Sequence, residues 1–214
     1  MKSKFDIIAK YYNILEILAF GRNLLNTRLY LLSKNKSQYK ILIIGEGTGS
    51  FLKYLVNCYP KSSITIIDSS NKMNKIIEKF NQTSKDENIT IFKQDYLKYI
   101  SAFKYDLIYT NFFLDCFKSS DVLKIVTKIK LMLNESGEWN DVEFTKSQKS
   151  NFLNHSYNKL ILNILYKFFR FICKIEASSI EDVDFNYQNL GFVLECEIFQ
   201  PFPSVRCRKY KLSL

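Results

Sequence analysis

The chain has 214 residues, 47% of them hydrophobic, so it can bury one substantial core but is too short for two domains of ordinary size. Its five cysteines are scattered and include no C-x-x-C pair, which argues against a disulfide framework or a zinc site and favours a reducing, cytoplasmic compartment. The formal charge of +10 comes mostly from lysines spread along the chain, which favours a solvated surface over a dedicated nucleic-acid face.

The first 36 residues are expected to form an N-terminal helical cap. Up to Phe20 the segment is apolar in places, but Asp6, Lys10 and Glu16 interrupt it at helical intervals, and no small-residue cleavage site follows. This pattern predicts an amphipathic helix and not a signal peptide. The remaining residues, 37–214, are expected to form one α/β domain.

From Tyr39 onward, apolar runs of strand length alternate with longer amphipathic runs. This alternation is typical of β-α-β units around a parallel sheet. Two of the helical runs begin at residues suited to N-capping. The expected strands are Lys40–Ile44, Ser63–Ile67, Ile89–Phe92 and Tyr105–Thr110, and the expected helices are Ser50–Cys58, Asn71–Phe80 and Asp121–Leu133.

The C-terminal third departs from this alternation. A fifth expected strand, Glu138–Phe144, is followed by a helical insertion at about residues 147–178. The most apolar part of the insertion is interrupted by three cations and is too short to span a bilayer, so we expect no transmembrane helix. Gly191–Phe199 and Val205–Leu212 are separated by a short turn and should form an antiparallel hairpin at one sheet edge.

The sharpest motif is the apolar strand Ile41–Ile44, which is followed at once by Gly45-Glu46-Gly47-Thr48-Gly49 and a helix. Glycines at such a turn let the backbone bend tightly and approach a ligand closely, and the helix N-terminus offers unpaired amide groups. A G-x-G-x-G run by itself is also compatible with a tight strand-to-helix turn that binds nothing.

A carboxylate supports the ligand-binding interpretation of this loop. The second strand ends at Asp68, about twenty residues after the loop, which is where a carboxylate can bind the two hydroxyls of a ribose. The alternative is that Asp68 only caps the turn that follows the strand.

With these landmarks the chain resembles the class I S-adenosylmethionine-dependent methyltransferases, from Tyr39 to the C-terminal hairpin. The Gly45–Gly49 loop is similar to their cofactor loop, Asp68-Ser69-Ser70-Asn71-Lys72-Met73 to their ribose-binding stretch, Gln94-Asp95-Tyr96 to their adenine-binding segment, and Tyr105–Phe112 to their fourth strand and active-site loop. The resemblance implies an α/β fold: a Rossmann-like, seven-stranded, mostly parallel sheet of order 3-2-1-4-5-7-6 with its last strand antiparallel. It also implies S-adenosyl-L-methionine as the cofactor.

The resemblance assigns the cofactor contacts to the glycine loop, to the ribose and adenine segments and to the start of the active-site loop. Asp95 is expected to accept a hydrogen bond from the adenine amino group, with Tyr96 or Phe112 beside the ring; the alternative for Asp95 is an ordinary loop carboxylate. Phe112, Phe113 and Phe117 either face the pocket or pack in the core. The expected cofactor-binding residues are Gly45, Glu46, Gly47, Thr48, Gly49, Asp68, Ser69, Met73, Asp95, Tyr96, Asn111 and Phe112.

Two positions depart from the family pattern. Many relatives carry an acidic residue where this chain has Ile43, to meet the methionine amino group, and Glu46 is expected to substitute for it. Asn111-Phe112-Phe113 keeps the asparagine of the N-P-P-Y motif of amino-group methyltransferases but neither proline, which weakens a nucleobase or glutamine acceptor. The phenylalanine-rich run that follows is more similar to small-molecule enzymes related to ubiquinone and menaquinone methyltransferases.

Methyl transfer needs little covalent help because the sulfonium donor is already activated, so a general base is useful only when the acceptor arrives protonated. Glu143 ends the fifth expected strand, on the side where open α/β sheets bind ligands. The candidate bases are Asp115, Glu143, His155 and Tyr12, followed by Asp141 and Tyr11.

Three functions remain open at this stage. They are methylation of oxygen, carbon or nitrogen on a small apolar or aromatic metabolite, methylation of RNA or protein, and a noncatalytic role as a cofactor-binding relative in a complex. The insertion suits a lid over an apolar acceptor, a helix lying on a membrane surface, or a helix packed on the sheet. The sequence predicts no metal site and does not define the oligomeric state.

Overall fold

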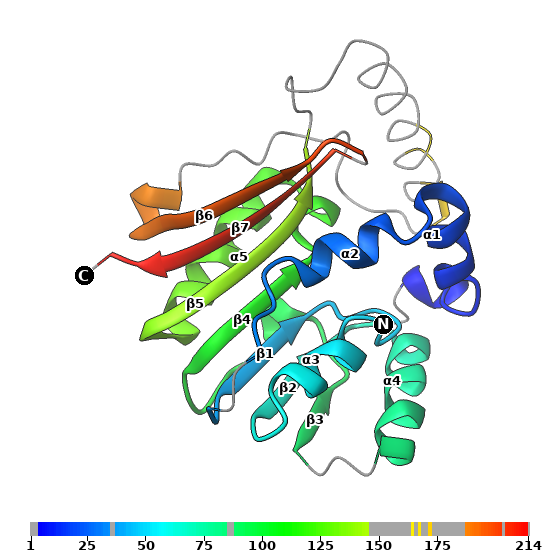
Figure 1. Cartoon of the computed structure of the whole chain (residues 1–214), viewed down its shortest axis with the longest axis horizontal. Coiled ribbons are helices and arrows are strands. Elements are labelled where there is room, and N and C mark those ends of the chain that lie inside the picture. Colours follow the sequence, from blue (N-terminus) through cyan, green and yellow to red (C-terminus); the bar gives the residue numbers. More distant parts are fainter. Residues whose placement is uncertain are drawn as a thin grey trace.

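Seven strands of the described chain form one mixed sheet in the order β3-β2-β1-β4-β5-β7-β6 (Figure 1). This computed structural model describes residues 4–34, 37–84, 88–145, 164, 167, 171–172, 187–202 and 204–213. The strands are β1 (Lys40–Ile44), β2 (Ser63–Ile67), β3 (Ile89–Phe92), β4 (Tyr105–Asn111), β5 (Leu133–Phe144), β6 (Phe192–Gln200) and β7 (Val205–Leu212).

The pairing of the strands confirms the predicted topology. β1, β2, β3, β4 and β5 pair in parallel, whereas β7 is antiparallel to both β5 and β6. β7 is therefore the one reversed strand of this sheet. Because the parallel strands all end at the same edge, the loops that follow them are brought together there.

Helices cover both faces of the sheet. α5 (Ser119–Met132) lies behind it in Figure 1, while α3 (Leu52–Cys58) lies in front, and α4 (Asn71–Ser84) packs in the same cluster as α3. On α5 the buried side chains recur at helical spacing, from Val122 to Ile129, as expected of a helix with one apolar stripe. The expected helices are therefore confirmed, with ends that differ by a few residues.

The fifth strand begins earlier than the sequence predicts, at Leu133 instead of Glu138. The register between β4 and β5 shifts here, because Tyr105 pairs with Leu133 while Leu107 pairs with Glu138. Gly137 lies inside this irregularity, where a Cβ atom would come within 2.8 Å of the Leu133 side chain. A glycine that we expected to precede the strand therefore permits a bulge within it.

The N-terminal segment forms three short pieces, two of which replace the single helix expected up to Phe20. They are η1 (Lys4–Ile7), α1 (Tyr12–Phe20) and α2 (Asn23–Leu29), and the chain turns between the last two at Gly21, whose φ is +61°. The α2 region packs on β5 and β7, and α1 lies at the end of the sheet where the parallel strands finish (Figure 1). The cap thus covers the edge at which the loops converge.

Most of the expected insertion, residues 147–178, lies outside the described residues, and so does His155. Residues 164, 167 and 171–172 are described, and they are helical. Within the described parts of the chain, no helix is both long and apolar enough to span a membrane. The division into a cap of residues 1–36 and a domain of residues 37–214 remains a prediction.

Candidate functional site

A pocket lies at the carboxyl ends of the parallel strands. The loops after β1, β2, β3 and β4 form one part of its lining, which we call the floor, and η1, α1 and Arg28 of α2 form another, which we call the roof. Of the twelve expected cofactor residues, all except Gly49 line the pocket. Residues that the sequence analysis took from four separate loops thus line one pocket, and their contact with the cofactor remains a prediction.

The glycine loop requires glycine at each of its three positions. Gly45, Gly47 and Gly49 have φ values of +74°, +70° and +79°, in the left-handed region that side chains disfavour. A Cβ atom on Gly45 would lie 2.6 Å from the Phe113 ring, whereas one on Gly47 would meet no atom within 4 Å. Gly47 therefore presents bare backbone to the pocket, and Gly49 serves the turn beneath it.

Asp68 holds two floor loops together. Its Oδ1 accepts the Ser70 amide at 2.8 Å, and its Oδ2 accepts the Gly47 amide at 3.1 Å. Burial raises the pKa of Asp68 to about 6, although both backbone donors oppose this shift. The carboxylate thus caps its own turn, as the alternative interpretation required, and it lines the pocket as well.

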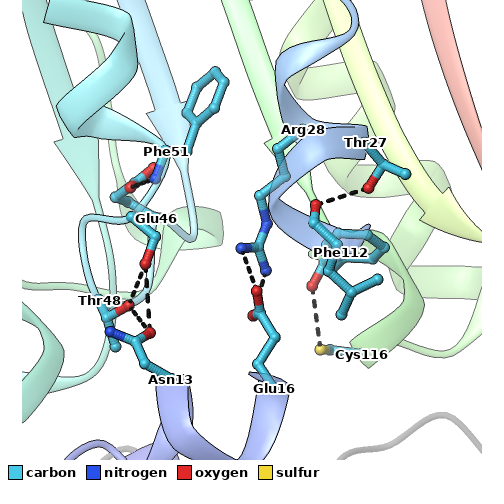
Figure 2. Close-up of polar contacts among 11 residues, drawn as sticks. Asn13, Glu16, Thr27, Arg28, Glu46, Thr48, Phe51, Phe112 and Cys116 are labelled. Atoms are coloured by element: carbon cyan, nitrogen blue, oxygen red, sulfur yellow. Dashed lines mark hydrogen bonds and ion pairs between the residues drawn. The ribbon is translucent and has the colours of Figure 1, made fainter. Parts of the chain in front are cut away.

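The Glu46 carboxylate also accepts backbone amides. Its Oε1 accepts the Phe51 amide at 3.1 Å (Figure 2). The same oxygen accepts the Leu52 amide at 2.9 Å, at the start of α3. Burial raises the pKa of Glu46 to about 7, and the nearby charge of Arg28 moderates this rise. The carboxylate also lines the pocket, so it lies where the expected contact with an amino group would have to be made.

The adenine segment combines a capping carboxylate with a buried ring. Asp95 Oδ1 accepts the Leu97 amide at 2.9 Å and caps η2 (Tyr96–Lys98). Tyr96 is buried, its ring meets the Phe113 ring edge-on at 6.1 Å, and its hydroxyl has no partner among the described residues. Both residues line the pocket.

The loop after β4 supplies the aromatic part of the floor. Both polar side-chain atoms of the buried Asn111 lack a hydrogen-bond partner within the described chain. Phe112 has a φ of +53°, an uncommon value for a residue with a side chain. Phe112, Phe113 and Phe117 all line the pocket, and they also pack against the buried core clusters, so the two interpretations of these rings do not exclude each other.

The Glu143 carboxylate holds this loop by accepting its backbone amides. Its Oε1 accepts the amides of Phe113 and Leu114 at 3.1 and 2.8 Å, and its Oε2 accepts that of Asp115 at 3.2 Å. Burial raises the pKa of Glu143 well above its usual range. The side chain does not line the pocket, so its position favours holding the aromatic loop over removing a proton.

The other candidate bases lie in different surroundings. Asp115 and Asp141 are not pocket-lining residues, and the buried Asp141 is paired with Arg208 at 2.7 Å. Tyr12 lines the pocket, and burial raises its pKa above the usual value. Tyr11 is exposed. Tyr12 is therefore the one expected base that the described structure places at the pocket.

Sequence reasoning missed the contacts that hold the roof. Asp6 Oδ1 accepts the Ser70 hydroxyl at 2.6 Å and the Lys72 amide at 3.0 Å. Asn13 Oδ1 accepts the Thr48 hydroxyl at 2.5 Å. These side chains are more than thirty positions apart in the chain, and no local pattern pairs them.

A buried ion pair joins the two helices of the cap. Arg28 contacts Glu16 through two hydrogen bonds of 2.9 and 2.8 Å, and its guanidinium lies over the Phe112 ring at 5.1 Å from the centroid (Figure 2). Arg28 is the only cation among the described residues that line the pocket. The signal in the sequence was a charge on each of two short apolar segments, Glu16 and Arg28.

No group of histidine, cysteine and acidic side chains in the described residues is arranged to hold a metal ion. The pocket instead offers backbone at Gly47, carboxylates at Glu46, Asp68 and Asp95, an unpaired amide at Asn111, and aromatic rings. This donor set suits a ligand with hydroxyl groups, amino groups and a planar ring.

Comparisons with known proteins agree with this description. Residues 41–137 match the model of a methyltransferase domain family. A malonyl-[acyl-carrier protein] O-methyltransferase from Ilyobacter polytropus is 31% identical over 103 residues, which are 48% of this chain and 38% of that protein. The chain thus spans well under half the length of that curated relative.

Two solved structures show the same fold at low sequence identity. An O-methyltransferase family 2 protein from Planctomyces limnophilus, in complex with apigenin, has a TM-score of 0.69 and 13% identity, with 95% of this chain and 61% of that chain covered. The N-methyltransferase NodS from Bradyrhizobium japonicum has a TM-score of 0.57 and 13% identity, with 90% and 93% covered. Residues 41–137 are therefore similar to a methyltransferase domain, and the sheet has the order and the fold of the Rossmann-like methyltransferase structures.

Proposed function

We propose that this protein transfers a methyl group from S-adenosylmethionine to a small apolar or aromatic acceptor. The observation that carries the proposal is one pocket in which the glycine loop, the Asp68 carboxylate and the phenylalanine-rich loop after β4 meet. The first two match what a nucleoside requires, and the third gives the remaining space an apolar wall.

The residues of the pocket fit the cofactor. Gly47 has room beside its backbone for a ligand to approach closely, and Asp68 lies at the end of β2, where ribose hydroxyls are bound in this fold. Asp95 and Tyr96 would flank the adenine, and Ser69 and Met73 would line the same part of the pocket. Glu46 is our candidate for the amino group of the methionine end.

The unsatisfied amide of Asn111 adds a second test of fit. A buried side chain with neither donor nor acceptor paired is costly, and a polar ligand would remove that cost. Asn111 lies at the end of β4 beside the glycine loop, where it would face the cofactor and the acceptor together. Thr48 and Phe112 complete this part of the lining.

When bound, the cofactor supplies an activated methyl group, so the protein has to bind, align and exclude water. The roof closes the pocket from the solvent side, and Glu143 fixes the backbone of the loop that carries Phe113. Tyr12 is our candidate for a hydrogen bond from its hydroxyl to the acceptor, because burial raises its pKa and keeps the phenol protonated. Asp115 and His155 remain weaker candidates for a role at the acceptor.

The aromatic lining of the pocket favours a small apolar acceptor over a macromolecule. Tyr12 and Phe5 of the roof, together with Phe112, Phe113 and Phe117, surround the space with rings. A nucleobase or a protein side chain would need a path to this space past the roof. Methylation of RNA or protein is the second candidate function; the net charge of +10 would support binding of RNA phosphates, although the lysines are spread along the chain.

Labelled methyl transfer distinguishes the two candidates. The full chain is incubated with labelled S-adenosylmethionine, a cellular small-molecule extract and cellular RNA fractions at about 150 mM salt, because diffuse electrostatic RNA binding weakens steeply with salt. Label in the organic-solvent fraction is the expected result. Selective labelling of one RNA species at that salt would overturn the small-molecule assignment, and binding of S-adenosylhomocysteine without any transfer would favour a noncatalytic relative.

A further inference from the structure

The outer face of the roof carries an exposed apolar row. It starts at Ile7 in η1 and continues on α1, where Ile14, Ile17 and Leu18 are at helical spacing and share one side of the helix. On α1, Ile14 is 56% exposed and Leu18 is 78% exposed, which is unusual for side chains of this size. The members of the row are Ile7, Tyr11, Ile14, Ile17 and Leu18.

The opposite side of the same segment already has its partners. Asp6 is bonded to Ser70, Asn13 to Thr48, and Glu16 to Arg28, while Phe20 is buried against β5 and β7. The apolar row is therefore not needed to attach the roof to the protein. The contacts of the described residues do not explain why these apolar side chains are exposed to water.

Charge around the row is one-sided. The two acidic residues of the roof, Asp6 and Glu16, point inward to the partners just named. The cations Lys10 and Arg22 are exposed instead, one beside Tyr11 and the other just past the end of α1. The row is thus bordered by positive charge without nearby exposed acid from its own segment.

A neighbouring helix extends this positive border. η1 packs against the start of α4, where Asp6 accepts the Lys72 amide. Lys72, Lys75 and Lys79 are exposed and are spaced so that they share one side of α4. Figure 1 shows α1 and α4 at the same end of the molecule.

We propose that this face, the apolar row of η1 and α1 with the lysines of α4, lies on an anionic membrane surface. An amphipathic segment with aliphatic side chains on one side and cations at its border inserts shallowly among lipid headgroups, and anionic lipids strengthen the contact. A folded acidic protein would also attract the lysines. The row, however, offers only one hydroxyl, that of Tyr11, with which to form specific hydrogen bonds, so a fluid apolar layer fits it better.

The contact would have a consequence for the pocket. The roof that meets the lipid also carries Phe5 and Tyr12 of the pocket lining, so an apolar acceptor dissolved in the bilayer would reach the pocket without crossing water. This consequence rests on the proposed function, whereas membrane binding itself does not. The two can therefore fail separately.

Vesicle sedimentation tests the proposal with the full chain. Vesicles of phosphatidylcholine alone are compared with vesicles containing equal parts of phosphatidylcholine and phosphatidylglycerol at about 100 mM salt. Binding to the anionic vesicles is expected, and the double variant Ile14→Glu with Leu18→Glu should bind them at least about tenfold more weakly. Lys72→Glu with Lys75→Glu should weaken binding about fivefold or more.

The matched control is Leu131→Glu, because Leu131 is 70% exposed but lies on α5, behind the sheet. It should bind vesicles like the wild type, and all variants should keep their affinity for S-adenosylhomocysteine and their melting temperature. No binding of the wild type to anionic vesicles would overturn the proposal, as would equal losses in Leu131→Glu and the α1 variant.

Two further outcomes assign the face to another occupant. If the chain does not bind vesicles but forms a complex with an acyl carrier protein, and Leu18→Glu abolishes that complex, the partner is an acidic protein. If sedimentation shows that the wild type is a dimer and the Leu18→Glu variant is a monomer, a second copy of the chain covers the row. Either result replaces the membrane, and neither changes the assignment of the cofactor pocket.

Discussion

The floor and the roof of the pocket are held together by different kinds of contact. In the floor, buried carboxylates accept backbone amides: Asp68 from two residues, Glu46 from two and Glu143 from three. In the roof, most of these contacts join two side chains, as in the pairs of Asn13 with Thr48 and Glu16 with Arg28, and one joins Asp6 to the Lys72 amide. The two regions line the same cavity.

This difference predicts different mobility. A carboxylate that binds amides orders only one side chain and fixes a loop that the strands already position, whereas a pair of side chains must order both partners. The floor should therefore keep its shape without a ligand, and the roof should open and close. Each experiment below tests one side of this contrast.

The largest effect is expected at the floor's glycine loop. Gly47→Val places a branched side chain at a φ of +70° and fills the space that a ligand needs beside the backbone. S-Adenosylhomocysteine binding should become undetectable by calorimetry, while the circular dichroism spectrum stays that of the wild type. Retained affinity in a folded variant would place the cofactor elsewhere.

Asp68→Ala should have the next largest effect. It removes charge-assisted hydrogen bonds to a ribose and releases the Gly47 amide, so S-adenosylhomocysteine should bind about 2 to 3 kcal/mol more weakly, roughly 30- to 150-fold. Asp106→Ala is the matched control, because Asp106 also accepts a backbone amide, that of Lys40, but lies at the opposite end of the sheet. Equal losses in both variants would mean that Asp68 acts only on folding.

The titration of Glu46, a residue of the floor, should make the free energy of unfolding depend on pH. Its pKa is raised to about 7 in the folded chain, so the folded state holds a proton that the unfolded state has lost between about pH 4.5 and 7. The free energy of unfolding should therefore fall as the pH rises through this range, by about 2 to 3 kcal/mol from this group. Asp68, with a pKa of about 6, adds a smaller change in the same direction.

Glu46→Gln keeps an acceptor oxygen for the α3 amides but does not titrate. The variant should flatten the pH dependence measured by urea unfolding at pH 5 and pH 7 without cofactor. Glu135→Gln, at an exposed position, should leave the dependence unchanged. A slope in Glu46→Gln equal to that of the wild type would show that the carboxyl is ionised throughout.

The same contrast explains how much of the molecule could be predicted from its sequence. The floor follows from short-range patterns, because an apolar strand, a glycine turn and a strand-ending Asp68 fix both the fold and the lining. The roof depends on pairs such as Asp6 with Ser70, whose partners are far apart in the chain and carry no periodic signal. Gly49 was assigned to the ligand because a turn residue and a contact residue have the same local pattern.

Some errors have a physical cause in long-range packing. The single helix expected up to Phe20 is divided because the chain turns between η1 and α1, where Ile8 and Ala9 are buried, and α1 then ends at Gly21. Glu143 was correctly placed at the end of β5, but the three amides that it accepts belong to another loop. The position of a carboxylate in a predicted strand indicates its place in the fold. Its role depends on the groups that it contacts when buried, and these can belong to another loop.

The smallest effect is expected at the roof, and trypsin measures it. Lys10 and Arg22 are exposed and flank α1, so cleavage there reports opening of this segment. Glu16→Gln keeps an acceptor for Arg28 but removes the charge of a buried pair, which should ease opening by about 1 to 2 kcal/mol and speed cleavage about five- to thirtyfold. The melting temperature should change little because the floor and sheet remain intact.

Saturating S-adenosylhomocysteine should slow cleavage in both proteins, since a ligand held under the roof stabilises the closed state. Glu138→Gln, which disrupts the Lys209 ion pair on the far part of the sheet, is the control and should be cleaved like the wild type. Equal cleavage with and without ligand would mean that the roof does not close over the cofactor, and a Glu16→Gln variant that unfolds as a whole would show that roof and floor are one cooperative unit.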